Sequence, residues 1–452
     1  MVSIHYRIAG RTSTEIVESV EGAVRDGLLA PNDRLPPVRA LAQELGVAAG
    51  TVAAAYRALG EHGVVSAEGR RGTTVRARPT VAARVAPRDP LPDGVRDLAS
   101  GHPDPLLLPR LATALASLPG GPAPAPALPL LPELADLARE RLRGDGVPAD
   151  DLAVTAGTLD GIQRVLAAHL RPGDRVAMED PAWPNALDLL AALGLHAVPV
   201  PIDDQGMRAD RLAAVLDAGA RAVIVTARAQ NPTGAAVTPG RAAQLREVLA
   251  ARPGVLLVED DHSAELSEVP LAPLAGAGGS WAFLRSTSKP YGPDLRLAVL
   301  AADPVTAGRV QGRQRAAGWV STLLQRLVVQ MWRDPATDAA VHHAALTYAR
   351  RRDGLVAELA ARGVPAHGRT GINVWVPLPA GRRGAEAAAV ARLAAAGWAV
   401  APGTRFTLDG AQGLRITVSG LQDGDLPRLA GDVTTAVGAG DGDREGPRGP
   451  SY

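Results

Sequence analysis

The 452-residue chain contains no cysteine. This absence excludes a disulfide scaffold, zinc or iron–sulfur sites ligated by cysteine, and a cysteine nucleophile. Long apolar runs are also missing: there is no stretch of about 18 uncharged apolar residues, so we expect no transmembrane helix. Residues 1–11 hold no apolar run suited to a signal peptide. We therefore expect a cytoplasmic protein.

Charge of one sign is not in excess. The chain has 48 Lys and Arg residues against 47 Asp and Glu, which gives a net charge of +1. A field that attracts polyanions over the whole surface is thereby excluded, and any contact with nucleic acid must come from a local patch. With 46% hydrophobic and 21% charged residues, the chain can bury a core. Its length is typical of two or three domains.

Lysine is nearly absent, because Lys289 is the single lysine among the 48 basic residues. Arginine replaces lysine readily in ion pairs and on solvated surfaces. It cannot replace lysine as the nucleophile of a Schiff base, because the guanidinium group stays protonated. The sequence therefore favours a chemical role for Lys289. The alternative is an ordinary surface lysine, and the motifs around it argue against that.

The N-terminal residues 1–78 are predicted to form a winged helix-turn-helix domain. Thr12 and Glu15 match a capping box at the start of a helix, and Gly46 follows the second helix as its C-terminal cap. Three helices and a hairpin with a basic tip are typical of winged helices. The elements are expected over residues 12–28, 36–45, 51–61, 64–66 and 73–75.

The remaining chain is predicted to hold one large domain between two irregular segments. Residues 79–96 are rich in Pro, Arg and Ala and have no periodicity, so we interpret them as a linker. Across residues 97–437, apolar strands alternate with helical stretches, which predicts an α/β domain with a large, mostly parallel mixed sheet and a smaller C-terminal α+β part. Residues 438–452 are of low complexity and are expected to be a disordered tail.

Polar clusters follow four of the predicted strands in this domain. In open α/β sheets, ligands bind beyond the carboxyl ends of the strands. Clusters that converge on such an edge are harder to explain as chance than any one of them alone. The clusters cover residues 179–184, 228–234, 259–262 and 285–289.

These motifs resemble those of the fold-type I, class I/II aminotransferases, which use pyridoxal phosphate. The most specific pieces are Ser286-Thr287-Ser288-Lys289, the segment 292–296 (GPDLR) and Asn231-Pro232-Thr233-Gly234, and the similarity begins near Asp97. Residues 12–75 resemble the winged helix of GntR-type regulators. The two in this order resemble the MocR-type regulators of the GntR superfamily, in which a winged helix is fused to an aminotransferase-like domain.

The resemblance implies pyridoxal 5'-phosphate as cofactor and assigns roles to its contacts. Lys289 would form the Schiff base with the aldehyde and serve as the catalytic amine. Asp260 would hold the pyridine nitrogen protonated, with the adjacent Asp261 as a less favoured alternative. Arg415 would grip a substrate carboxylate. The other implied contacts are Gly157 and Thr158 at a helix start for the phosphate, Ser286 and Arg296 beside them, Trp183 on the ring face and Asn231 at the phenolic oxygen.

His262 departs from the pattern of the family, which usually places a tyrosine there, against the phenolic oxygen of the cofactor. A histidine can also form a hydrogen bond at that position, but its charge varies near neutral pH. A zinc site at His262 with Asp260 or Glu265 has little support, because no second histidine lies at ligand spacing. We therefore expect no metal site and keep His262 among the cofactor contacts.

Double-stranded DNA is the expected partner of the N-terminal domain. Residues 1–80 hold ten arginines and eight acidic residues, a local excess of only +2. The turn before the third helix is Ala48-Ala49-Gly50, where GntR-type domains usually place Ser or Thr and Arg, so two contacts are missing. The alternative is a winged helix retained for dimerisation or as a relic. The candidate contacts to phosphates and base edges are Arg34, Arg39, Thr51, Arg57, Arg70 and Arg71.

Three functions stay open at this point. The first is a transcription regulator whose DNA binding responds to pyridoxal phosphate, or to its aldimine with an amino acid, and which acts as a head-to-tail homodimer by resemblance. The second is a working aminotransferase, since Lys289, Asp260, Asn231, Arg296 and Arg415 are all present. The third and weakest is a structural relic that binds the cofactor without using it.

Overall fold

The computed structural model describes the greater part of the chain, and it divides into two compact units. Residues 1–84, with the short stretches 170–175 and 188–197, are grouped in one unit, and the rest of the chain forms the other. The described residues are 6, 8–25, 28–30, 32–61, 64–67, 72–75, 91–118, 129–379, 384–409 and 412–438.

The N-terminal region folds into three helices and a small antiparallel sheet, as predicted. The elements are α1 (Ser13–Arg25), α2 (Val38–Leu45), α3 (Ala49–Glu61), β1 (Val65–Ala67) and β2 (Thr73–Val75). The capping box forms at α1: Thr12 Oγ1 accepts the Glu15 N–H at 3.2 Å, and Glu15 Oε2 accepts the Arg11 N–H at 2.8 Å. Tyr56 of α3 is buried and donates its hydroxyl to the carbonyl of Pro36 at 2.8 Å.

Several boundaries in this region differ from the prediction: helix α1 ends at Arg25 rather than at residue 28, and helix α2 begins at Val38 rather than at residue 36. Helix α3 begins at Ala49, two residues early, and the Thr51 N–H donates to the carbonyl of Ala48 at 3.0 Å. No Ser, Thr, Asp or Asn marks this start, so the sequence contains no cap signal there. Strand β1 lies one residue later than predicted. Most of the basic tip of the predicted hairpin, between residues 66 and 73, lies outside the described residues.

The second unit is built on an eight-stranded sheet of order β4-β11-β10-β9-β8-β5-β6-β7. Strands β5, β8, β9 and β10 are parallel, whereas β11 runs antiparallel to both of its neighbours. This confirms the predicted α/β fold with a mostly parallel sheet. The bounds are β4 (Asp151–Thr155), β5 (Arg175–Asp180), β6 (His196–Asp203), β7 (Gly206–Met207), β8 (Ala222–Thr226), β9 (Leu256–Asp261), β10 (Trp281–Ser286) and β11 (Ala298–Ala302).

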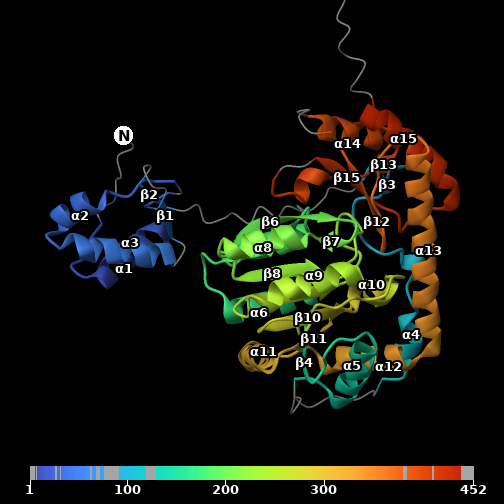
Figure 1. Ribbon diagram of the computed structural model, residues 1–452, viewed down its shortest axis with the longest axis horizontal. Coiled ribbons are helices and arrows are strands. Elements are labelled where there is room, and N and C mark those ends of the chain that lie inside the picture. Colours follow the sequence, from blue (N-terminus) through green and yellow to red (C-terminus); the bar gives the residue numbers. More distant parts are fainter. Residues whose placement is uncertain are drawn as a thin grey trace, which may run out of the picture. The chain divides into compact units, whose positions relative to one another are not determined.

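Helices cover this sheet (Figure 1). Helices α6 and α11 pack against β4, β10 and β11, and α8 packs against α9. None of the helices in the described ranges is long and apolar enough to cross a bilayer. The helical elements are α4 (Leu111–Ala116), α5 (Pro132–Gly144), α6 (Thr158–His169), α7 (Pro184–Ala192), α8 (Ala209–Asp217), α9 (Pro239–Ala250), α10 (Ser288–Tyr291), α11 (Pro304–Ala317) and α12 (Thr322–Arg333), with the 3-10 turns η2 (Pro105–Leu107) and η3 (Ala264–Leu266).

A smaller α+β part follows, also as predicted. Its antiparallel sheet has the order β12-β15-β14, and the separate pair β3 and β13 is parallel. The long helix α13 runs from α12 to this part, where it packs against β12 and α15 (Figure 1). The elements are β3 (Arg96–Asp97), α13 (Pro335–Ala360), β12 (Asn373–Pro377), α14 (Ala385–Ala395), β13 (Trp398–Ala399), β14 (Ala401–Pro402), η4 (Gly403–Arg405), β15 (Gly413–Thr417), η5 (Asp423–Asp425) and α15 (Leu426–Gly438).

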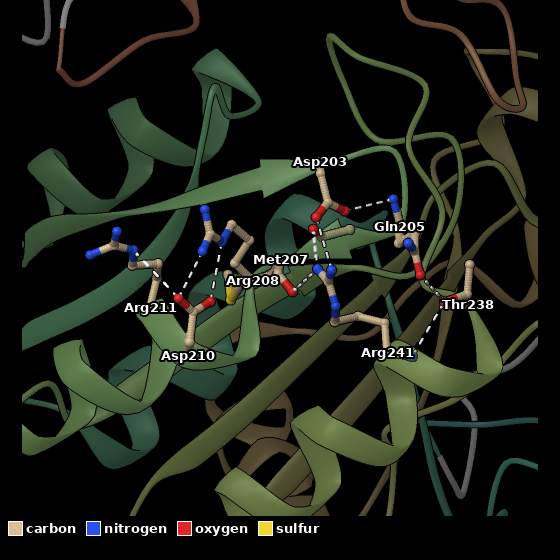
Figure 2. Close-up of polar contacts among 9 residues, drawn as sticks. Asp203, Gln205, Met207, Arg208, Asp210, Arg211, Thr238 and Arg241 are labelled. Atoms are coloured by element: carbon tan, nitrogen blue, oxygen red, sulfur yellow. Dashed lines mark hydrogen bonds and ion pairs between the residues drawn. The ribbon is translucent and has the colours of Figure 1, made fainter.

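The end of the large sheet at β7 is fastened by one arginine (Figure 2). Arg241 of α9 donates to the carbonyls of Gly206 and Met207 at 3.0 and 2.8 Å, and to Asp203 Oδ2 at 2.8 Å. These bonds occupy backbone acceptors in the β6–β7 hairpin that would otherwise need water. Two further arginines flank the exposed Asp210, one of which, Arg208, donates to its Oδ2 at 2.8 Å. This polar surface is separate from the predicted site.

Candidate functional site

Three of the predicted polar clusters begin inside their strands rather than after them. Strands β5, β9 and β10 extend to Asp180, Asp261 and Ser286. Charged residues can lie within a buried strand when other groups form hydrogen bonds or ion pairs with them. The carboxylate of Glu259 shows this, because it accepts the N–H groups of Leu274 and Ala275 at 2.9 to 3.0 Å.

A cavity of about 710 Å³ lies where these clusters meet. Its size is typical of small-molecule sites. Gly157 and Asp260 are the two predicted cofactor contacts outside its lining, and each adjoins a lining residue. The structure thus brings together predicted residues that are far apart in sequence. Those that line the cavity are Thr158, Trp183, Asn231, His262, Ser286, Lys289, Arg296 and Arg415.

Asp260 and Asp261 have opposite surroundings. Successive side chains of a strand point to opposite faces of the sheet. Asp261 pairs with Arg228 and with Arg285, each through Oδ2 at 2.9 Å. Asp260 is only 3% exposed, and its Oδ1 has no hydrogen-bond partner among the described residues. Burial, and then the negative charges of Asp261 and Glu179, raise the pKa of Asp260 well above its usual value.

Lys289 lies in the short helix α10 and lines the cavity. Its Nζ donates to the carbonyl of Gly101. Burial lowers the pKa of Lys289 to about 8, and the positive charge of Arg415 adds to this effect. A much larger share of the amine is therefore neutral near pH 7 than for a solvated lysine, and the neutral amine is the nucleophilic form.

Small and hydroxylic residues surround the guanidinium group of Arg296. Arg296 Nη1 donates to Ser288 Oγ at 3.3 Å, and the Ser288 N–H donates to Ser286 Oγ at 3.1 Å. Gly157 has a positive φ of +93°, and a Cβ there would lie 2.5 Å from Arg296 Nη2. With the start of α6 at Thr158, these groups form a cradle of donors for an anion. The sequence motif contained Ser288, but its role in the cradle was not predicted.

Arg415 lies in β15, is buried and lines the cavity. Its Nη1 donates to Asn231 Oδ1 at 3.3 Å, and its Nη2 donates to the carbonyl of Ala99. The ring of Phe406 lies 5.1 Å from the guanidinium carbon. This packing holds a planar bidentate donor at the cavity wall, which suits a carboxylate.

His262 also lines the cavity, and its Nδ1 lies 3.8 Å from Asp260 Oδ2. Burial lowers the pKa of His262 to about 4, and the positive charge of Lys289 contributes. The imidazole is therefore neutral at physiological pH, with one ring nitrogen as donor and the other as acceptor. The variable charge considered from the sequence does not arise at this position.

The sequence did not predict the segment 97–102, although five of its residues line the cavity: Asp97, Ala99, Ser100, Gly101 and His102. The pairing of β3 with β13, 302 residues later in the chain, brings this segment to the site. It contains no strand or helix pattern, and only its position after the linker distinguishes it. Pairing across such a separation leaves no local signal.

Glu179, Gln230 and Thr233, which the sequence did not predict as site residues, hold the loop that carries Asn231. The buried Glu179 accepts the Thr226 N–H at 3.0 Å and the Gln230 side-chain amide at 3.2 Å. Gln230 in turn accepts the N–H and the hydroxyl of Thr233 at 3.1 and 2.7 Å. These bonds join the ends of β5 and β8 to the loop that carries Asn231. Burial raises the pKa of Glu179 to about 7.

The predicted DNA contacts are only partly described. Arg34, Arg39 and Arg57 are exposed, and Thr51 is half-buried in α3. The guanidinium group of Arg34 lies against the backbone of Gly72, at the foot of the hairpin. Arg70 and Arg71 lie outside the described residues. Within those residues, no group of three or more His, Asp or Glu is arranged to hold a metal ion.

Comparison with known proteins assigns both parts of the chain. Residues 95–433 match the family "Aminotransferase class I and II", and residues 12–75 match "Bacterial regulatory proteins, gntR family". The chain is 40% identical to the vitamin B6 salvage pathway transcriptional repressor PtsJ of Salmonella typhimurium, over 95% of this chain and 99% of that one. This chain belongs to the MocR-type GntR regulators. As a member it is a transcriptional regulator with an aminotransferase-like domain, which confirms the regulatory part of the first of the three functions.

Other similarities agree with this assignment. The transcriptional regulator TauR of Rhodobacter capsulatus is 30% identical over 88% of this MocR-type chain and 90% of its own. The α-aminoadipate aminotransferase LysN of Thermus thermophilus has the same fold in its larger part: the TM-score is 0.66 at 23% identity, over 77% of this chain and 93% of LysN. An archaeal alanine:glyoxylate aminotransferase is similar with a TM-score of 0.69 at 22% identity, over 76% of this chain and 91% of that one.

Proposed function

We propose that this regulator binds pyridoxal phosphate in the 710 Å³ cavity and that the bound cofactor changes its affinity for DNA. The observation that carries the proposal is that the buried Asp260 carboxylate, with an oxygen that has no partner among the described residues, lies next to the cavity of the one lysine, Lys289. Because PtsJ is named a repressor of vitamin B6 salvage and matches nearly the whole chain, we propose the same role here.

The side chains present fit this cofactor. The unpartnered Asp260 Oδ1 needs a donor, and a protonated pyridine nitrogen supplies one together with the opposite charge. Ser286, Ser288, Arg296 and the start of α6 would hold the phosphate. When bound, pyridoxal phosphate supplies an electrophilic aldehyde and a ring that withdraws electrons.

The chain's own residues prepare this site. Burial keeps part of the Lys289 amine neutral, so that it can attack a carbonyl carbon without first losing a proton to water. Arg415 donates to Asn231 Oδ1, and Gln230 supports the loop that carries Asn231. Asn231 would donate to the phenolic oxygen, with the neutral His262 as a second contact. Trp183 lines the same cavity and would cover one face of the ring.

At the other end of the chain, we propose a DNA-binding winged helix over residues 1–78, a linker over 79–96, the cofactor domain over 97–437 and a disordered tail over 438–452. Arginines before α2, on α2, on α3 and in the hairpin would neutralise phosphates, and those among the described residues are exposed. They are Arg34, Arg39 and Arg57, with Thr51, Arg70 and Arg71 beside them.

We further propose that the regulator is a cytoplasmic, head-to-tail homodimer. Large apolar side chains are exposed on neighbouring elements of the second unit: Leu106 of η2 is 89% exposed, Leu115 of α4 51% and Leu323 of α12 57%. Helix α12 packs against α4. Large apolar side chains exposed on packed helices support a surface that another chain covers. Two winged helices on two half-sites also require a dimer.

Reduction with borohydride tests the cofactor site. Purified protein incubated with pyridoxal phosphate and then reduced should carry a pyridoxyl group on Lys289, and Lys289→Ala should carry none. Retardation of the upstream DNA of its own gene, with and without the cofactor, tests the regulatory role. The proposal fails if no adduct forms, or if the cofactor leaves DNA binding unchanged. The effector must bind the free and DNA-bound arrangements with different affinity for such control.

Transamination is the second candidate function, and one observation favours it: Lys289, Asn231 and Arg415 line one cavity, and the lysine has a lowered pKa. Arg415 would hold the carboxylate of an amino acid, and the Lys289 amine would move the proton at its Cα. Release of a keto acid from any amino acid, abolished by Lys289→Ala, would establish this activity beside regulation.

A further inference from the structure

Two backbone carbonyl groups of one short segment accept hydrogen bonds from side chains of the proposed ligand site. The segment is residues 98–102, which we call the strap. The carbonyl of Gly101 accepts a hydrogen bond from Lys289 Nζ, and the carbonyl of Ala99 accepts one from Arg415 Nη2. The strap therefore binds the amine and the guanidinium group to which the proposed function assigns the cofactor aldehyde and a carboxylate.

The two ends of the strap are held by the protein framework. Leu98 bonds through its N–H to Ala399 and through its carbonyl to Thr417, both at 2.8 Å. At the other end, the carbonyl of His102 accepts the Ser419 hydroxyl at 2.6 Å. Residues 99–101 between these anchors line the cavity. Within the strap, the Ala99 N–H also donates to Asp97 Oδ1 at 2.8 Å, whereas the carbonyls of Ala99 and Gly101 bond to side chains of the site.

Gly101 makes this close approach possible. Its φ is +69°, and a Cβ added there would lie 2.8 Å from Arg415 Nη1. With any other residue, either Arg415 or the strap must shift, and the residue would be strained at this φ. The close contact between the strap and Arg415 therefore requires glycine at position 101.

Ligand binding competes with both contacts. When the neutral Lys289 amine condenses with the aldehyde of pyridoxal phosphate, a carbon–nitrogen double bond forms, and the two amine hydrogens leave with the aldehyde oxygen as water. The hydrogens that Nζ offers to the carbonyl of Gly101 are lost in that step. A carboxylate on Arg415 would likewise displace the weaker neutral acceptor, the carbonyl of Ala99.

We propose that the strap is a ligand-released element: the free protein holds it on Lys289 and Arg415, pyridoxal phosphate on Lys289 releases Gly101, and an amino-acid carboxylate on Arg415 releases Ala99. This inference rests on the proposed function. Asp97 of β3 separates the strap from residues 79–96, the segment that leads from the winged helix. Release of the strap gives the ligand site two states, and a regulator requires two such states.

Hydrogen–deuterium exchange on the full-length protein tests the proposal. Cofactors usually slow exchange around their site, so a local increase is distinctive. We expect the peptide that contains residues 98–102 to exchange at least twofold faster once pyridoxal phosphate is bound, while the peptides around Asp260 and Ser286 slow down. Unchanged or slower exchange in the strap, in protein that carries the adduct on Lys289, overturns the inference and leaves the proposed function intact. Protein without the adduct contradicts the proposed function instead.

A pair of glycine variants adds a matched comparison. Gly101→Ala should release the strap in the free protein, so that its exchange no longer rises with the cofactor and the cofactor-dependent change in DNA affinity falls below half of the wild-type value. Gly363→Ala is the control, because Gly363 has a similar φ of +73° and no atom within 4 Å of an added Cβ. Wild-type coupling in a folded Gly101→Ala protein overturns the inference. If that variant does not fold, the wild-type exchange result decides alone.

Discussion

Asp260 and Asp261 are neighbours in β9, yet Asp261 is neutralised by Arg228 and Arg285, whereas Asp260 lies beside the cavity with an oxygen that no described residue partners. The alternation of side chains along a strand separates the two carboxylates. One of them has a structural role in holding buried arginines. The other is available to a ligand.

Asn substitutions at these two positions should therefore have different consequences. We expect Asp260→Asn to weaken pyridoxal phosphate binding by 10- to 100-fold, because a charge-assisted hydrogen bond contributes roughly 1.5–3 kcal/mol, with little loss of stability. Asp261→Asn should lower the free energy of unfolding by about 3 kcal/mol or more, because it leaves buried arginine charge uncompensated. Cofactor titration and urea unfolding of both variants measure this contrast. Equal effects on binding would contradict it.

The rate of adduct formation should depend on pH through Lys289. The pKa of this amine is lowered to about 8, and only the neutral amine attacks the aldehyde. We expect the rate constant to rise about tenfold per pH unit below pH 8 and to level off above it. Stopped-flow absorbance between pH 6 and 9 records the profile. A rate that still rises steeply above pH 9, as for a solvated lysine, would show that burial does not lower this pKa.

The cradle around Arg296 should not tolerate a side chain at Gly157. A Cβ there would lie 2.5 Å from Arg296 Nη2, so we expect Gly157→Ala to weaken cofactor binding at least tenfold. Gly173→Ala is the matched control, since Gly173 has φ +95° against +93° for Gly157 and no atom within 4 Å of an added Cβ. The two variants then share the backbone strain and differ in the contact. Similar cofactor affinities would show that the cradle does not bind the phosphate.

Glu179 should make stability depend on pH. Burial raises its pKa from 4.5 to about 7, so between these values the folded state keeps a proton that the unfolded state has lost. Stability then falls as the pH rises from about 4.5 to 7, by roughly 3 kcal/mol at most. Glu179→Gln mimics the protonated form and should remove the part of the pH-dependent loss of stability that Glu179 causes. Urea unfolding at pH 5 and pH 7 measures it, with the exposed Glu133→Gln as control, and an unchanged pH dependence would refute the assignment.

Exposed arginines of the N-terminal unit should contribute to DNA binding through phosphates. We expect Arg39→Ala and Arg57→Ala each to weaken binding to all sequences alike and to lower the slope of log affinity against log salt by about 1. Arg211→Ala removes an exposed arginine from the other unit and should change nothing. Fluorescence anisotropy at several salt concentrations supplies the slopes. Loss of binding to one sequence alone would indicate a base contact instead.

The fold class and most residues of the candidate site could be predicted from the sequence. Apolar strands alternating with helices predict the α/β fold, because periodicity reflects which face is buried. Lys289 is conspicuous in a chain whose other basic residues are all arginine, because a Schiff base requires an amine. The strand-end clusters predict which residues meet, because the carboxyl ends of parallel strands share one edge of a sheet.

Only the tertiary structure decided how those residues are partnered. The choice between Asp260 and Asp261 depends on arginines in β10 and after β8, the support of Asn231 depends on Glu179 in β5, and the neutral state of His262 depends on burial. The strap reaches the site through a strand pairing between residues about 300 positions apart. Burial, pairing and pKa are properties of neighbours in space, and a linear pattern records only neighbours along the chain.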